Sequence, residues 1–172
     1  MIEFPNISPE IFTISLGGFD FSLRWYALSY IAGFIVALYI MKFFVRRDHM
    51  WKYRSPPMDV EQTDDILTYI IFGVILGGRL GYVLFYNFDY YLFNPIDVLR
   101  IWDGGMSFHG GFAGVVLSLI YYCSRNGIDI MPAADLLALA SPPGLLFGRV
   151  ANFINAELWG RTTDVPWGVI FP

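Results

Sequence analysis

Two short segments hold most of the side chains that could do chemistry. The first, residues 104–111, reads Gly-Gly-Met-Ser-Phe-His-Gly-Gly and places His109 between two glycine pairs. A neutral imidazole can accept a proton near physiological pH, and glycines let other groups approach closely. His109 is therefore a candidate general base. The alternative is a histidine that only hydrogen-bonds a loop carbonyl.

The second segment, residues 148–161, reads Gly-Arg-Val-Ala-Asn-Phe-Ile-Asn-Ala-Glu-Leu-Trp-Gly-Arg. Arg149 and Asn152 are three residues apart, so they are neighbours on one face of a helix. The planar guanidinium of an arginine suits a phosphate or a carboxylate, and nearby amides and Glu157 can orient it or hold hydroxyls. We expect a lipid headgroup as the ligand. The alternative is a salt bridge of Glu157 with Arg149 or Arg161 that only holds a loop.

The composition indicates that these segments belong to a membrane protein. Of the 172 residues, 56% are hydrophobic and 15% are charged, and the mean hydropathy is +0.51. These values exclude a disordered chain, and the single cysteine, Cys123, excludes an internal disulfide. The net charge of −4 leaves no basic patch for nucleic acid. The sequence has no metal-ligand cluster, phosphate-binding Gly-Lys-Ser loop or dinucleotide fingerprint.

We expect an all-α polytopic fold, with one membrane-embedded domain covering residues 1–172. Apolar runs predict at least four transmembrane helices, at about residues 21–45, 66–86, 104–122 and 131–154, the last of which is interrupted by two prolines at 142 and 143. The third run is short for a full crossing. It therefore begins near Gly104 or is shielded from lipid by other helices.

The distribution of basic residues predicts the orientation of these helices. Four follow the first span, namely Arg46, Arg47, Lys52 and Arg54, whereas only Arg100 lies between the second and third spans. The first loop is therefore expected in the cytoplasm, and the N-terminus, residues 87–108 and everything after Ile154 are expected on the outer face of the membrane. Aromatic residues then gather near one interface at Trp25, Tyr26, Tyr86, Tyr90, Tyr91 and Trp102, and near the other at Trp51 and Tyr53.

Small residues repeat at four-residue spacing in every predicted span. The four series are Ser29, Gly33, Ala37; Gly73, Gly77, Gly81; Gly110, Gly114, Ser118; and Ala140, Gly144, Gly148. Because lipid gives little hydrophobic drive for helix association, such seams supply close packing instead. They predict a compact helical bundle.

Arg79 and Asp135 are charged residues inside apolar segments, where they are costly unless they face protein or water. Arg79 lies about 200° around the helix from Gly77 and Gly81, so it points away from the seam. An ion pair between Arg79 and Asp135 is one prediction. Alternatively, Asp135 caps a helix start, as Asp64 or Asp65 could for the second span.

Both chemical segments resemble motifs of the prolipoprotein diacylglyceryl transferase family. Residues 104–111 are similar to its histidine motif, and residues 148–161 to its signature, whose Arg, Asn, Asn, Glu and Gly fall on Arg149, Asn152, Asn155, Glu157 and Gly160. The resemblance extends to Arg-Trp-Tyr at 24–26, where Tyr26 takes the place of the family's functional tyrosine, to Gly-Gly-Arg-Leu-Gly-Tyr at 77–82 and to Ala-Asp at 134–135. It implies a multi-pass enzyme of the bacterial inner membrane, with a seven-helix body and a periplasmic head.

The resemblance implies transfer of a diacylglyceryl group from phosphatidylglycerol to the lipobox cysteine thiol of a prolipoprotein signal peptide, with release of glycerol phosphate. His109 and Tyr26 are then the expected catalytic residues, since a thiol must lose its proton to become a good nucleophile. The expected phospholipid-binding residues are Arg149, Asn152, Asn155, Glu157 and Gly160, with Arg79, Asp135 and Arg161 in support. No metal or redox cofactor is required, and the expected partners are phosphatidylglycerol, the prolipoprotein and membrane lipid.

Two alternatives of other classes stay open. A transporter would use the prolines at 142 and 143 as the break in a discontinuous helix and Arg149 as its anion ligand, although no inverted repeat is present. A non-catalytic phospholipid-binding protein, or an inactive fragment, is favoured only by length. The sequence stops at Pro172, whereas the family continues through further helices with another functional arginine and glutamates. We therefore expect this chain to insert into a membrane without turning over.

Overall fold

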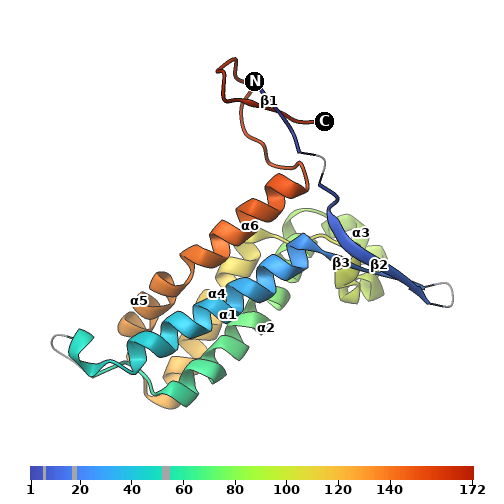
Figure 1. The fold of residues 1–172 in the computed structure, drawn as a ribbon. Helices are drawn as coiled ribbons and strands as arrows, with labels where there is room; N and C mark the ends of the chain where they lie inside the picture. The colour runs from blue at the N-terminus through green and yellow to red at the C-terminus, as the bar shows by residue number, and fades with distance from the viewer. Residues whose placement is uncertain (6, 17–18, 52–54) are drawn as a thin grey trace. The chain divides into compact units, whose positions relative to one another are not determined.

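The computed structural model describes residues 1–5, 7–16, 19–51 and 55–172 (Figure 1). These residues form two compact units, Met1–Tyr39 together with Leu139–Pro172, and Ile40–Ala138. Lys52, Tyr53 and Arg54, which contribute to the predicted inner loop and interface, lie outside the described residues.

The first unit combines short strands with helical segments. Strand β1 (Ile2–Glu3) pairs in parallel with β4 (Val169–Ile170), and β2 (Glu10–Leu16) pairs antiparallel with β3 (Phe19–Arg24). Helix α1 (Trp25–Val45) follows β3 directly, and α6 (Pro142–Ile154) begins with two prolines, whose fixed φ suits a first helical turn. The two helices approach at Gly33, where an added Cβ would lie 3.0 Å from the Cα of Gly144.

These strands correct the all-α expectation and the expected start of the first span. Residues 21–24 belong to β3 and not to a helix. The physical reason is that Phe21, Ser22, Leu23 and Arg24 alternate apolar and polar side chains with the two-residue period of a strand. The fold is therefore mostly helical, with a small hairpin before α1.

The second unit is built on the close packing of α2 (Val60–Phe85) against α4 (Phe108–Asn126), which run side by side in Figure 1. The predicted glycine seams of these helices face each other. A Cβ added to Gly73 or Gly114 would collide with the other helix, and one added to Gly81 would lie 2.7 Å from the Cα of Gly110. The two backbones are therefore in contact, and the glycines allow it.

Shorter helical elements connect or extend these helices. They are η1 (Asp48–Met50), α3 (Phe88–Phe93), η2 (Pro95–Leu99), η3 (Ile101–Asp103) and α5 (Ile130–Ala140).

Helix α2 begins at Val60, before the expected residue 66, because Asp59 caps it. A carboxylate oxygen of Asp59 accepts a hydrogen bond from the Gln62 amide at 2.8 Å, and the Gln62 side chain accepts one from the Asp59 amide at 2.9 Å. This is a capping box. The prediction that Asp64 or Asp65 caps this helix is wrong, and Asp64 instead pairs with Lys42 at 2.7 Å.

Helix α4 begins at Phe108, after the expected residue 104. Gly104 and Gly105 have φ values of +84° and +80°, which a right-handed helix excludes. Ser107 then caps the helix, since its Oγ accepts a hydrogen bond from the Gly110 amide at 3.2 Å. Gly104 and Gly105 thus form the turn that precedes α4, and His109 lies in the first turn of that helix.

Among the described residues, three helical segments are long and apolar enough to cross a membrane, Trp25–Val45, Val60–Phe85 and Ile130–Ile154. The last consists of α5 and α6. Helix α4 is not one of them, so the third expected span, at about residues 104–122, is not confirmed. On α2, the side chains of Phe72, Leu76 and Leu80 are 60%, 59% and 51% exposed at four-residue spacing, which suits contact with lipid.

Candidate functional site

The end of α6 and the following turn form a polar cluster around Glu157. Its Oε1 accepts hydrogen bonds from Nδ2 of Asn152 at 2.9 Å and from Nδ2 of Asn155 at 3.3 Å. The Glu157 amide in turn donates to the Asn152 carbonyl at 3.0 Å. Asn152 is buried, whereas Glu157 is exposed. One carboxylate therefore fixes both amide side chains of the segment.

The turn around Glu157 has an unusual backbone. Ala156, Leu158 and Gly160 have φ values of 53°, 55° and 85°. A residue with a Cβ loses about 1–2 kcal/mol in this left-handed region, whereas glycine enters it freely. Strain of this kind persists only where the surrounding contacts determine the conformation, and it gathers at functional sites. The Glu157 hydrogen bonds are the contacts that hold this turn.

Arg149 lies one turn before this cluster on α6 and is exposed. Within the described parts of the chain, its side chain has no hydrogen bond or ion pair, and the same is true of the side chain of exposed Arg161. The alternative salt bridge of Glu157 with either arginine is therefore not formed, and Glu157 Oε1 instead accepts hydrogen bonds from the two amides. The Arg149 guanidinium is free to take an anion from outside this segment.

His109 lies in the first turn of α4, two residues after the capping Ser107, and is exposed. Its ring stands edge-on to that of Phe108, with the centroids 5.8 Å apart. Among the residues that the structure describes, no loop carbonyl accepts a hydrogen bond from His109, so that alternative is not formed. The imidazole is exposed on a helix whose start is fixed.

Arg79 is buried on α2 and binds main-chain carbonyls instead of a carboxylate. Its four hydrogen bonds run from Nε to Val98 O at 2.8 Å, from Nη2 to Asp97 O at 2.6 Å, and from Nη1 to Gly104 O at 2.6 Å and Gly105 O at 3.2 Å. Asp135 is exposed on α5 and is not among its partners. The predicted ion pair of Arg79 with Asp135 is therefore wrong.

The segment that Arg79 binds has further ties of its own. The guanidinium lies over the Tyr91 ring, 5.2 Å from its centroid. The Asp97 carboxylate accepts a hydrogen bond from the Tyr90 hydroxyl at 2.6 Å and pairs with Arg100 at 3.3 Å. The hydrogen bond to Asp97, together with its negative charge, raises the pKa of Tyr90.

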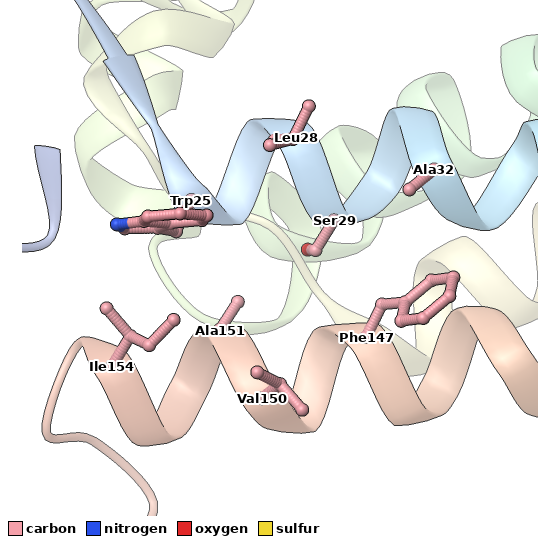
Figure 2. Close-up of a pocket in the computed structure, with 8 residues that line it drawn as sticks. All are labelled: Trp25, Leu28, Ser29, Ala32, Phe147, Val150, Ala151 and Ile154. Atoms are coloured by element: carbon pink, nitrogen blue, oxygen red, sulfur yellow. The ribbon is translucent and has the colours of Figure 1, made fainter. Parts of the chain in front are cut away.

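Tyr26 lies in the first turn of α1, half-buried, with its ring 5.4 Å from that of Tyr30. Beside it, α1 and α6 form an apolar groove of about 170 Å³ (Figure 2). The groove is lined by Trp25, Leu28, Ser29 and Ala32 from α1 and by Phe147, Val150, Ala151 and Ile154 from α6. Figure 2 shows Ser29 and Ala151 pointing toward one another across it. An apolar surface therefore adjoins the polar cluster of α6.

Two features of these sites could not be recognised from the residue types, namely two of the carbonyls that bind Arg79 and the left-handed backbone around Glu157. The carbonyls of Asp97 and Val98 hold Arg79, yet main-chain groups carry no residue pattern. The glycine pair at 104 and 105 marks a turn, and this signal could have placed the other two carbonyls. The left-handed conformations of Ala156 and Leu158 have no sequence signal, since neither is glycine or asparagine.

Comparisons with known proteins match this arrangement of motifs to one family. The sequence pattern of prolipoprotein diacylglyceryl transferase matches residues 11–172. The chain belongs to this family. It is 56% identical to the phosphatidylglycerol–prolipoprotein diacylglyceryl transferase of Cereibacter sphaeroides over 171 residues, which are 99% of this chain and 84% of that protein.

Two further family members are similar over the same extent of this chain. The transferase of Roseobacter denitrificans is 56% identical over 99% of this chain and 58% of its own length, and that of Brucella anthropi is 46% identical over 99% and 59%. The chain therefore spans less than two thirds of the length of these two relatives.

Proposed function

We propose that the protein transfers the diacylglyceryl group of phosphatidylglycerol to the lipobox cysteine thiol of a prolipoprotein, in the bacterial inner membrane. Its family membership and the activity for which its relatives are named support this proposal. The observation that carries it is the signature segment, where one carboxylate orders two amides and the side chain of Arg149 has no partner among the described residues.

The reaction forms one bond and breaks one. The cysteine sulfur attacks the terminal glyceryl carbon of the diacylglyceryl group, a carbon–sulfur bond forms, and the bond from that carbon to the phosphate oxygen breaks. The bonding electrons leave with glycerol phosphate, so the negative charge on the phosphate grows from about −1 toward −2. Arg149 meets that growing charge with its positive guanidinium fork, which stabilises the transition state more than the bound lipid.

His109 takes the thiol proton in this proposal. A thiolate is the reactive form of cysteine, and an exposed imidazole at the start of a rigid helix is suited to accept its proton. Tyr26 is the second catalytic residue proposed, from the first turn of α1.

The remaining residues of the signature bind the headgroup. Asn152, Asn155 and Glu157 supply donors and acceptors for the free glycerol hydroxyls of phosphatidylglycerol. The Oδ1 of Asn155 is buried and has no hydrogen-bond partner among the described residues, so a hydroxyl donor from the substrate would satisfy it. Gly160 permits the turn that closes this segment, and the apolar groove of α1 and α6 suits an acyl chain. Arg161 and Asp135 support the site as further charges.

We also propose the membrane arrangement. Residues 1–172 form a single embedded domain in which α4 is a fourth crossing, and the loop after α1 lies in the cytoplasm. The N-terminus and His109 are then periplasmic. The partners are phosphatidylglycerol, a prolipoprotein with a lipobox cysteine and the surrounding lipid, without nucleic acid.

The transporter alternative loses its main support in the structure. It needs an unwound break in a membrane helix, yet only Ser141 separates α5 from α6. The Leu145 amide donates to the Ser141 carbonyl at 3.2 Å, so the helical hydrogen bonding resumes at once. The proline pair begins a helix and does not open a binding site.

The test is lipidation of a lipobox peptide in vesicles. The 172-residue chain, and a chimera that carries it in place of the matching region of the Roseobacter denitrificans relative, are supplied with phosphatidylglycerol or with phosphatidylethanolamine. From the chimera we expect a diacylglyceryl thioether only with phosphatidylglycerol and with a cysteine in the peptide, and not with serine, whereas the 172-residue chain alone should form no product. If the chimera forms no lipidated peptide but carries glycerol phosphate across the membrane of sealed vesicles, the result would favour the transporter alternative.

A further inference from the structure

We propose that Arg79 is a positioning residue for His109. In this inference, the buried guanidinium fixes residues 97–107 and through them the first turn of α4. It rests on the proposed role of His109 as the base, and it goes beyond that role by naming what holds the imidazole in place.

The contacts of Arg79 are suited to fixing a chain path. Four carbonyl groups, on Asp97, Val98, Gly104 and Gly105, accept from three nitrogens of one planar group. Because every acceptor belongs to the main chain, these bonds set the course of the backbone and not the rotamer of a side chain. Arg79 is only 4% exposed, so water does not compete effectively for the same carbonyls.

The same stretch of α2 also holds the start of α4. The residue before Arg79, Gly78, accepts a hydrogen bond from the Ser107 amide at 2.9 Å. Ser107 then caps α4 through the Gly110 amide, and His109 lies between these two residues. A Cβ added to Gly105 would lie 2.5 Å from Cε1 of Tyr82, so the α2 face fits closely around the turn.

A lysine cannot reproduce this arrangement. Its three donors diverge from one atom, whereas the arginine fork directs separate donors toward carbonyls on both sides of the segment. Arg79→Lys therefore keeps the charge but leaves some of these four carbonyls without the donors that Arg79 supplies. The turn at residues 104–107 then loses its fixed position, and the imidazole of His109 moves with it.

The direct test observes the imidazoles themselves. The chain has only two histidines, His109 and His49, so ring-labelled histidine gives two signals in an NMR spectrum of the full chain in lipid nanodiscs. We expect Arg79→Lys to shift or broaden the His109 signal and leave the His49 signal unchanged. Gly105→Ala, which disturbs the same turn by a clash and an unfavourable φ, should give the same pattern.

The matched control is Arg100→Gln, because Arg100 is an exposed arginine of the same segment whose side chain, within the described part of the chain, pairs with Asp97 alone. It should leave both signals in place. An unchanged His109 signal in both Arg79→Lys and Gly105→Ala would overturn the inference. Equal changes at His49 and His109 would also overturn it, since they would indicate a general loss of fold.

The kinetic test uses the chimera. Arg79→Lys should lower kcat by about 10- to 100-fold, as expected when a catalytic group is displaced by about 1 Å, while KM for phosphatidylglycerol stays within about twofold. Its pH–rate profile should lose the limb that depends on His109. A rise in KM with unchanged kcat would assign Arg79 to lipid binding instead. Should the unsubstituted chimera itself form no product, the proposed function fails, and the NMR result still decides the positioning role separately.

Discussion

Replacing Glu157 with glutamine removes the charge that holds the signature turn while keeping the size of the side chain. In the structure, Oε1 of Glu157 accepts from Asn152 at 2.9 Å and from Asn155 at 3.3 Å. Glutamine offers one carbonyl oxygen in the same place. The hydrogen bonds can still form, but they are no longer assisted by charge.

The expected loss follows from these distances. A hydrogen bond to a charged group contributes about 1.5–3 kcal/mol and a neutral one about 0.5–1.5 kcal/mol, so the difference is about 1 kcal/mol for the shorter bond. The longer bond and the exposure of Glu157 reduce the second contribution, and the total is about 1–2 kcal/mol. This equals the cost of about one left-handed residue, and the turn contains two, Ala156 and Leu158. The turn should therefore open more often.

Amide hydrogen exchange measures this opening. The Ala156 amide donates to Phe153 O at 3.0 Å and the Glu157 amide to Asn152 O at 3.0 Å, so both are protected only while the turn is closed. In Glu157→Gln, their protection should fall by about 5- to 30-fold. Asp164→Asn, which neutralises an exposed carboxylate nearby in the sequence, should change neither amide. Unchanged protection in Glu157→Gln would refute the claim that the carboxylate holds the turn.

Three further predictions follow from the site and the fold. Arg149→Lys should slow lipidation by about 10- to 100-fold, since an ammonium replaces the two parallel donors of a guanidinium. An unchanged rate and an unchanged dependence on phosphatidylglycerol would show that another residue binds the headgroup. Gly114→Ala should destabilise the pairing of α2 with α4 by about 1–3 kcal/mol in thermal unfolding. Gly148→Ala is the control and should leave the stability unchanged, because its added Cβ meets nothing within 4 Å. Equal effects of the two substitutions would contradict the close packing of α2 on α4. Asp48→Cys and Asp97→Cys should react with an impermeant thiol reagent from opposite sides of the membrane, and labelling of both from outside intact spheroplasts would reverse the topology.

The seams of α2 and α4 could be read from the sequence because they depend on side-chain size at regular spacing. Gly73, Gly81 and Gly110 lie where the two helices touch. The direction of Arg79 away from the seam also followed from helix geometry. The cap of α2 was within reach of the sequence too, since Asp59 and Gln62 have the spacing of a capping box.

The partner of Arg79 could not be predicted in the same way. A search for a counter-charge leads to Asp135, yet the actual acceptors are main-chain carbonyls that any residue provides. The turn around Glu157 could not be predicted either, because its conformation depends on hydrogen bonds and not on residue type. Ala156 adopts a left-handed conformation because the surrounding hydrogen bonds impose it, and its own side chain gives no sign of it.

The proposed reaction depends most directly on His109 as the base for thiol attack. The decisive measurement is mass spectrometry of a lipobox peptide after incubation with phosphatidylglycerol vesicles and the chimera carrying His109→Gln or the matched His49→Gln. We predict that the diacylglyceryl thioether forms at a normal rate with His49→Gln and at least about 100-fold more slowly with His109→Gln. A factor of this size is what general-base catalysis typically contributes. A normal rate in the His109→Gln chimera across the pH range would contradict the account.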